Sequence, residues 1–411
     1  MAEESRRLPR GCSTICLPID KDDYERIVSS AEDFRAWLDG CFRETPELFP
    51  EAFASGYALK DSRISKKTGL ALRRVVCKDT AGQAFTVRPS FVLPYMTALT
   101  DDVEKALYLR RFRVPFHALA RVFGKDPDYW YRLEVSLGRN SVAGSTVRRA
   151  DLPEHLLADE HHQTLDGEKV YVATTVGGGC CLGASVSSSA GEEGLSAAYG
   201  VFKQEARDIK KDYQPKTVNL DGWAATRASW RGLFVCVAVM RCFLHGWLGI
   251  RDRGKHLEET FKELGDKVWH AYRAKTKREM AQRLRRLREW AKENLKGAVL
   301  EETLKLCQRS KEYQEALDHP NCHRTSNMLD RVMREMNRYF FDGQHLHGSQ
   351  KAAELHCRAW ALLFNFAPWS PAAAKANDGS ECPAERLNHH RYHDNWLHNL
   401  LLSASLAGFR R

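Results

Sequence analysis

HLLADEHHQTLDGEKVYVATTVGGGCCLGASVS, residues 155–187, holds the clearest strand signal in the sequence. Its three strand-like runs, 155–159, 169–176 and 180–186, are separated by Asp-Gly and Gly-Gly-Gly. Short runs of this kind with such turn residues between them are typical of antiparallel strands joined by tight connections. The segment therefore predicts a three-stranded meander.

The residues after the meander predict two more strands with helices between them. Apolar residues recur at helical spacing over 195–209, and a strand is expected over 217–221. A short helix over 224–232 then leads to a buried strand over 233–240. A strand–helix–strand link of this length joins parallel strands, which gives the order βββαβαβ. That order is typical of a ribonuclease-H-like core, an α/β fold in which helices cover a mixed sheet.

Patterns on both sides of this core predict further units. Residues 72–76 and 84–87 indicate a β-hairpin around the turn Asp79–Gly82, and the rest of the N-terminal region alternates between helical and irregular patterns. The expected units are an N-terminal region over 1–99, a helix-turn-helix-like region over 100–150, the core over 151–250 and 321–366, a basic helical insertion over 251–320, and a loop and helix over 367–411.

Three short helices are expected between residues 100 and 150, so the core is expected to follow a mainly helical N-terminal DNA-binding region. Asp101 or Asp102 can cap the first, Pro115 precedes the second, and Lys125-Asp126-Pro127 forms a turn before the third. Such helices suit a helix-turn-helix that places one helix against DNA, while the alternative is an ordinary helical subdomain with a solvated basic face. The residues expected to contact DNA are Arg110, Arg111, Arg113, Arg121, Arg132 and Arg139.

The insertion has a strong positive charge. Residues 273–296 hold ten Lys or Arg against three acids in a pattern that is helical almost throughout. A charge run of this kind is either a solvated spacer or an arm that contacts phosphates, and we favour the second interpretation. Its candidate DNA contacts are Arg283, Arg285, Arg286 and Arg288.

Acidic residues lie at the ends of two strands that are neighbours in such a sheet. Asp159 ends the first core strand and Asp221 ends the fourth, so their carboxylates can converge. Carboxylates so placed can hold two Mg²⁺ (or Mn²⁺) ions, which polarise the attacking and leaving oxygens at phosphorus. Asp330, one turn into a helix that begins near Asn327, is the expected third ligand. Each acid also has a structural alternative, because Asp221 precedes a turn glycine and Asp330 suits the first turn of a helix.

Three segments carry a resemblance to a known family. TVNLDGWAATRASW (217–230), CFLH (242–245) and RTSNMLDRVMREMNRYF (324–340) resemble the second catalytic block, the C(2)H motif and the third catalytic block of bacterial insertion-sequence transposases related to the Mutator-like group. The resemblance covers about residues 152–364. It implies a ribonuclease-H-like domain with a DDE triad at Asp159, Asp221 and Asp330, cleavage of DNA at element ends, joining of the 3′-hydroxyl to target DNA, and a homodimer or larger assembly on DNA.

The sequence departs from that family pattern at two points. The third acid is usually Glu, whereas this chain has Asp330, and Glu160 adjoins Asp159 as a second candidate for the first ligand. Glu335 and Glu354 are alternatives for the third ligand. The resemblance therefore leaves open a catalytically inactive DNA-binding protein of the same descent. A ribonuclease-H-like nuclease that cuts without strand transfer is a further alternative.

Cysteine and histidine residues offer weaker metal candidates. Cys242 and His245, three residues apart after a buried strand, can bind a soft metal or hold the insertion against the core, and a packing role is favoured. We expect packing or solvent roles for the cluster of His389, His390, His393 and His398 as well.

Composition limits the classes of function. The 411 residues include 63 Lys or Arg and 53 Asp or Glu, and a sequence pI near 9.0 favours a polyanionic partner, DNA before an anionic membrane. The longest apolar run, 233–244, is interrupted by Arg241 and is too short to span a bilayer. The first eleven residues lack the apolar core of a secretory signal, so we expect free cysteines and a cytoplasmic location at the bacterial nucleoid.

Overall fold

The computed structural model describes residues 12–78, 82–94 and 96–409. Residues 1–11, which carry the expectation about a secretory signal, and Asp79 to Ala81 of the expected hairpin turn lie outside the described residues. The chain is a mixed α/β protein with two mixed sheets. Within the described residues, no helix is long and apolar enough to cross a membrane.

The N-terminal region contains a sheet of four strands. Strands β3 (Ala71–Cys77) and β4 (Ala84–Pro89) form the expected antiparallel pair, while β1 (Thr14–Leu17) and β2 (Tyr57–Ile64) complete the order β1-β4-β3-β2. The expected hairpin is therefore part of a larger sheet, whose strands β1 and β2 were not expected from the sequence. β2 lacks a clear strand pattern in the sequence because most of its side chains are exposed and polar. β1 lacks one because it has only four residues. The helices of this region are α1 (Lys21–Ile27), α2 (Ala31–Glu44), η1 (Pro46–Leu48) and η2 (Glu51–Ser55).

The three helices expected after residue 100 are present as α3 (Thr100–Arg111), α4 (Phe116–Phe123) and α5 (Pro127–Leu137). The side chain of Asp126 caps α5 by accepting a hydrogen bond from the Tyr129 amide. One face of α5 packs into the interior, where Trp130, Leu133 and Leu137 are buried. A short helix, α6 (Val142–Thr146), leads into the core.

The central sheet has five strands in the order β7-β6-β5-β8-β9. β5 (His155–Leu165), β6 (Glu168–Gly177) and β7 (Cys180–Ser187) form the expected antiparallel meander. β8 (Thr217–Leu220) and β9 (Ala238–Arg241) run parallel to β5, with α7 (Glu192–Ile209) and α8 (Ala224–Leu233) as the connecting helices. The expected order of elements is confirmed. The last strand starts at Ala238 instead of residue 233, because α8 continues to Leu233.

Helices cover both faces of the central sheet. On one face, α7 and α8 pack against Leu156, Ala158 and Leu182. On the other face, α14 (Asn327–Asp342) and α15 (Gln350–Phe366) pack against Leu157 and Val172. Neighbouring residues of β5 therefore point to opposite helical layers, as the period of a strand requires.

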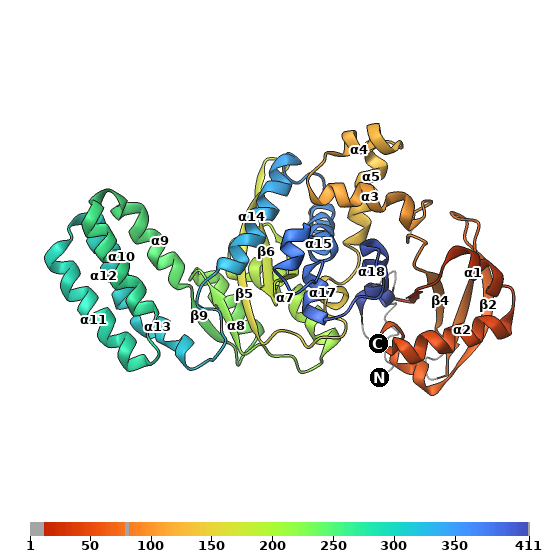
Figure 1. The fold of residues 1–411 in the computed structure, drawn as a ribbon, viewed down its shortest axis with the longest axis horizontal. Helices are drawn as coiled ribbons and strands as arrows, with labels where there is room; N and C mark the ends of the chain where they lie inside the picture. Colours follow the sequence, from red (N-terminus) through yellow and green to blue (C-terminus); the bar gives the residue numbers. More distant parts are fainter. Residues whose placement is uncertain (1–11, 79–81, 95, 410–411) are drawn as a thin grey trace.

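The helical insertion is a bundle with its own apolar core. It comprises α9 (Phe243–Gly254), η3 (Lys255–Leu257), α10 (Glu258–Tyr272), α11 (Lys277–Asn294), α12 (Gly297–Gln308), α13 (Ser310–Gln314) and η4 (Glu315–Leu317). The insertion begins near Phe243 and not at residue 251, because Phe243 and Ile250 of α9 belong to that core. Figure 1 shows the bundle at one end of the molecule and the N-terminal sheet at the other.

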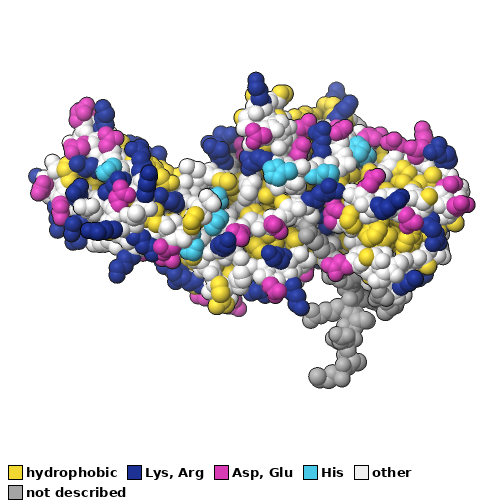
Figure 2. All heavy atoms as spheres, turned by 60° about the horizontal axis from the view of Figure 1, so that its bottom comes forward, with side chains coloured by type: hydrophobic (Ala, Val, Ile, Leu, Met, Phe, Trp, Pro, Cys, Tyr) yellow, Lys and Arg dark blue, Asp and Glu magenta, His cyan; other side chains and the backbone are white. Residues whose placement is uncertain are grey.

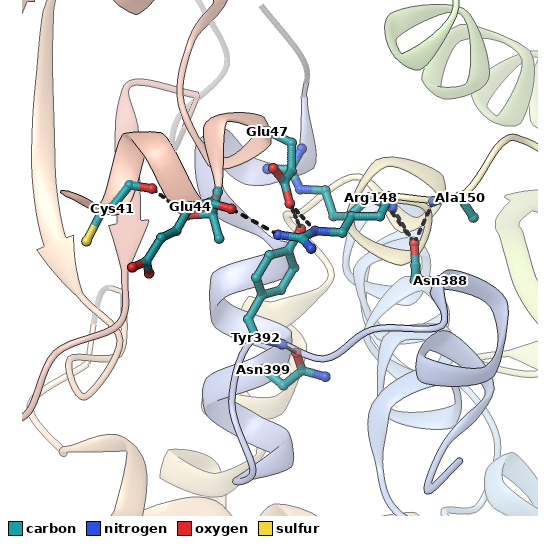
Figure 3. A network of polar contacts seen from close by, with 10 residues as sticks. Cys41, Glu44, Glu47, Arg148, Ala150, Asn388, Tyr392 and Asn399 are labelled. Carbon is teal, nitrogen blue, oxygen red and sulfur yellow. Dashed lines mark hydrogen bonds and ion pairs between the residues drawn. The ribbon is translucent and has the colours of Figure 1, made fainter. Parts of the chain in front are cut away.

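The C-terminal segment connects the N-terminal region to the core through hydrogen bonds. It contains α16 (Pro371–Lys375), α17 (Pro383–Asn388), α18 (Trp396–Ser403) and η5 (Ser405–Gly408). In Figure 3, Glu47 lies beside Tyr392, whose hydroxyl donates a hydrogen bond to it at 2.7 Å, and Arg149 Nε lies 2.5 Å from the same carboxylate oxygen. Asn388 accepts hydrogen bonds at 2.9 Å from the amides of Arg148 and Arg149. Three segments far apart in the chain are thus held together at one place.

Candidate metal-binding acidic site

Asp159 and Asp221 lie at equivalent positions on neighbouring parallel strands. The register of β5 and β8 pairs His155 with Thr217 and Leu157 with Asn219. Two residues further along each strand direction come Asp159 and Asp221, so the two acids are level with each other. The expectation that Asp159 ends its strand is wrong, because β5 continues to Leu165, whereas Asp221 directly follows the end of β8. This placement agrees with the convergence expected from the sequence.

The alternation of β5 separates Asp159 from Glu160. Leu157 packs in the layer of α14, and Leu156 and Ala158 pack in the layer of α7 and α8. Asp159 therefore faces the α14 layer and Glu160 the opposite one. Glu160 Oε1 accepts hydrogen bonds at 2.8 Å from Tyr199 of α7 and from Thr226 of α8. Glu160 therefore connects the sheet to α7 and α8, and Asp159 lies on the face that α14 covers.

Electrostatics supports the closeness of the two aspartates. The pKa of Asp159 is raised to about 7, first by burial and next by the negative charges of Asp221 and Glu160. The Asp221 carboxylate also accepts a hydrogen bond at 2.7 Å from the Trp223 amide, which fixes the chain as it leaves β8. A buried carboxylate whose charge is disfavoured by a second carboxylate nearby is a favourable environment for a divalent cation.

Cys242 and His245 lie next to this acidic pair. A hydrogen bond between the two side chains is the largest cause that raises the pKa of His245 to about 9, and the charges of Asp159 and Asp221 raise it further against the effect of burial. Burial would raise the pKa of the Cys242 thiol, but the hydrogen bond and the charge of His245 outweigh it and the pKa is lowered. His245 Nδ1 is buried without a hydrogen-bond partner among the described residues.

A chain of hydrogen bonds connects Cys242 to Asp330. The Ser326 hydroxyl donates to Asp330 Oδ2 at 3.0 Å, and Cys242 Sγ donates to Ser326 Oγ at 3.4 Å. A hydroxyl carries one proton, so with that proton directed at Asp330 the serine accepts from the thiol. The packing role expected for Cys242 is consistent with this contact, which holds the start of α14 against the end of β9.

Two hydrogen bonds to backbone carbonyls hold the residues just before α14 against β8 and the start of α9. The Asn219 side-chain amide donates to the His323 carbonyl at 2.8 Å, and the Phe243 amide donates to the Arg324 carbonyl at 3.1 Å. The start of α14 is therefore pinned to the ends of both β8 and β9. Ser326 was not among the site residues expected from the sequence, although a serine directly before an expected helix start is typical of a helix N-cap.

The three acids do not form one ready-made ligand set. Asp330 reaches the same corner of the sheet, but its carboxylate is bound by Ser326. Within residues 12–409, apart from the undescribed positions, no three His, Cys, Asp or Glu side chains are grouped so that they can hold one ion. Oxygen ligands from Asp159 and Asp221 fit a hard cation such as Mg²⁺. To join them, Asp330 would share its carboxylate between Ser326 and the ion.

The two alternative third ligands lie in other surroundings. Glu335 forms an ion pair with Arg111 at 3.2 Å. Glu354 on α15 is half-buried near Arg358 and Glu205, and burial raises its pKa. None of the three candidates shows a contact with the aspartate pair among the described residues, and Asp330 is favoured because Ser326 and Cys242 connect its helix to the end of β9.

The expected DNA contact at Arg110 is wrong. Its side chain is buried, with Nε 2.7 Å from Glu134 Oε2 and Nη2 donating to the Tyr339 hydroxyl at 2.6 Å. Arg111 is largely buried in its pair with Glu335, and Arg113 pairs with Asp342 at 3.3 Å. Of the six arginines expected to contact DNA in this region, Arg121, Arg132 and Arg139 are exposed.

The arginines of the insertion differ in their exposure. Arg283 is half-buried and pairs with Glu279, whereas Arg285, Arg286 and Arg288 are exposed on α11. Figure 2 shows Lys and Arg side chains spread over the insertion end of the molecule, with acidic side chains among them. The face is basic without being uniformly positive.

The C-terminal histidines have structural surroundings. His398 is buried, with Nδ1 2.9 Å from Ser90 Oγ and Nε2 3.1 Å from Asp101 Oδ1. The ring of His393 stacks on that of His398, with centroids 4.4 Å apart. His390 stacks edge-on against Tyr392, and His389 ends α17 with φ of 49°. These contacts agree with the expected packing role.

No protein-family profile and no curated protein matches this sequence.

Proposed function

We propose that the chain is a metal-dependent DNA transposase that cuts the ends of a mobile element and joins the freed 3′-hydroxyl to target DNA. The observation that carries this proposal is the level placement of Asp159 on β5 and Asp221 just after the adjacent parallel strand β8, where the charge of Asp221 helps to raise the pKa of Asp159. The partners proposed are element-end and target DNA, bound by a homodimer or larger assembly at the bacterial nucleoid.

The architecture around the acids supports the proposal. The order β7-β6-β5-β8-β9, with β6 alone antiparallel to the others, is the one expected of a ribonuclease-H-like core. A helical bundle inserted between β9 and α14 agrees with the insertion that the resemblance implies. Asp330, the proposed third acid, lies in the first turn of α14, and hydrogen bonds hold the start of this helix against the ends of β8 and β9.

The residues have separate roles in this chemistry. Asp159 and Asp221 would hold Mg²⁺ or Mn²⁺, which polarises the phosphorus-bound oxygens and lowers the pKa of an attacking water. Asp330 is the proposed third ligand, and Ser326 sets its position before DNA and metal bind. Ser326, Cys242 and His245 keep the start of α14 at the carboxyl ends of the parallel strands, and exposed arginines of α5 and α11 would bind phosphates.

A nicking assay on supercoiled plasmid DNA in Mg²⁺ or Mn²⁺ tests the proposal. The intact protein should nick the plasmid, and Asp221→Asn should abolish nicking while DNA binding in EDTA is retained. Pre-cut element ends then test joining, because a nuclease without strand transfer would cut but never join. Normal nicking by Asp221→Asn would overturn the metal assignment.

A second candidate function is a catalytically inactive DNA-binding protein of the same descent. The hydrogen bond between Ser326 and Asp330, together with the lack of a preformed three-ligand group in the described part of the chain, favours it. This candidate predicts binding to DNA with no nicking in either metal. The same plasmid assay therefore distinguishes the two functions.

A further inference from the structure

A cavity of about 400 Å³ lies between the edge of the central sheet and the inserted bundle. Its walls include Arg227 and Arg231 of α8, Arg241 of β9, and Lys311 and Glu312 of α13. The cavity is thus built from both the core and the insertion. Asp159, Asp221 and Asp330 do not line this cavity.

Positive charge prevails in this cavity. Four cationic side chains line it, against the carboxylates of Glu312 and Glu315. Glu312 is shared, with one oxygen 3.0 Å from Arg241 Nη1 and 3.9 Å from Arg227 Nη1. Arg231 and Lys311 are exposed, and neither forms an ion pair with any described residue. A concave surface with surplus cations concentrates anions.

The backbone of β9 adds further donors to the cavity. β9 is an edge strand, and on its paired side the Ala238 amide donates to Lys216 and the Cys242 amide donates to Leu220. Amides alternate in direction along a parallel strand, so those of Val239 and Arg241 point away from β8, toward the open edge that the cavity occupies. Arginine side chains together with backbone amides are the donors that proteins use for phosphate groups.

The cavity adjoins the acidic site through Gly222. This glycine follows Asp221 and lines the cavity, with φ of +105°. A Cβ at this position would lie 2.6 Å from the guanidinium carbon of Arg241. The glycine therefore lets the chain turn directly beside Arg241, and the cavity opens one residue away from a proposed metal-binding carboxylate.

We propose that this cavity binds a phosphodiester group of the DNA strand that is cut at Asp159 and Asp221. The identity of the strand rests on the proposed function. A phosphate would replace the Glu312 carboxylate between Arg227 and Arg241, because guanidinium groups pair with both anions in the same geometry. Arg231 and Lys311 would neutralise the adjacent phosphates.

The test compares variants by fluorescence anisotropy with a labelled DNA duplex in EDTA over a series of salt concentrations. Arg231→Gln with Lys311→Gln should lower the slope of log Kd against log salt by about 2, since each lost phosphate contact releases about 0.9 fewer counterions. Lys60→Gln with Arg63→Gln, a matched loss of charge on the exposed strand β2, should leave the slope near that of the parent protein. An equal decrease for both pairs would overturn the assignment.

A variant that removes a negative charge from the cavity should change DNA affinity in the opposite direction, and this makes it the more stringent test. Glu312→Gln should tighten DNA binding, because the phosphate then no longer competes with a carboxylate; unchanged or weaker binding would contradict the proposal. Displacement of the duplex by polyglutamate as readily as by unlabelled DNA would also overturn it, in favour of an acidic protein partner.

These readouts need no catalysis. If the parent protein fails to nick plasmid DNA while the salt slope and the Glu312→Gln effect are as expected, the proposed function fails and the cavity assignment stands. If the protein nicks DNA normally and the cavity variants bind like the parent, the reverse holds.

Discussion

Replacement of Asp159 with asparagine should remove a pH-dependent loss of stability. In the folded chain the pKa of Asp159 is about 7, because the carboxyl group is buried and faces the negative charge of Asp221. In an unfolded chain an aspartate titrates near pH 4. Between these values the folded state binds more protons than the unfolded state, so its stability is fully present at low pH and falls as pH rises through about 7.

The size of the effect follows from the two pKa values. About 3 pH units separate them, and each corresponds to about 1.4 kcal/mol, so the full loss approaches about 4 kcal/mol above pH 7. Asparagine keeps the shape of the side chain and carries no charge. At about pH 8.5 Asp159→Asn should therefore be more stable than the parent by about 2–4 kcal/mol, and near pH 4 the two should be closely similar.

Urea denaturation followed by tryptophan fluorescence measures this difference. Trp230 lies in the core layer behind the sheet and reports on its unfolding. The titrations are carried out in EDTA, so that no divalent cation compensates for the charge of Asp159. Asp151→Asn, at an exposed position just before the core, is the matched control and should follow the parent at every pH. Parallel pH profiles for Asp159→Asn and the parent would refute the reasoning.

The remaining predictions concern contacts away from the aspartate pair. Arg110→Gln removes the arginine partner of buried Glu134, which keeps its contacts with His356 and Tyr339, and should cost about 3–5 kcal/mol in a thermal melt. The exposed Arg132→Gln should cost less than about 1 kcal/mol, and equal losses would contradict the burial of the first pair. Ser326→Ala should destabilise the chain by about 1–2 kcal/mol through loss of its hydrogen bonds, and an unchanged melting temperature would speak against the hydrogen-bonded chain. Leu284→Ala should cost about 2–5 kcal/mol within the insertion. Hydrogen exchange should then rise over 243–317 only, and faster exchange in β5 to β9 would show that the bundle has no separate core.

Much of the central fold could be predicted from local patterns. The strands β5 to β7 are apolar runs with glycine turns, and α7 shows a regular apolar period, so short-range sequence information was sufficient. The boundary of β9 was misplaced because Val235 is apolar but 83% exposed, and hydrophobicity alone does not distinguish it from a strand residue. β1 and β2 of the N-terminal sheet depend on pairing between distant segments, which no local pattern reveals.

The candidate site was predictable in its backbone and less so in its side-chain partners. The topology was enough to place Asp159 beside Asp221, and strand alternation then separates Asp159 from Glu160. The burial of Arg110 could not be foreseen, since it depends on Tyr339, more than two hundred residues away in the chain. The hydrogen bond between Ser326 and Asp330 depends likewise on rotamers that spacing does not specify.

Calorimetric titration of the parent protein with Mn²⁺, beside Asp159→Asn, Asp221→Asn and Asp330→Asn, tests the central claim most directly. We expect a metal site in the parent protein whose affinity for Mn²⁺ falls more than about tenfold in each of the first two variants, because each loses a charged oxygen ligand. An Mn²⁺ affinity that is absent from the parent, or unchanged in Asp159→Asn and Asp221→Asn, would contradict it.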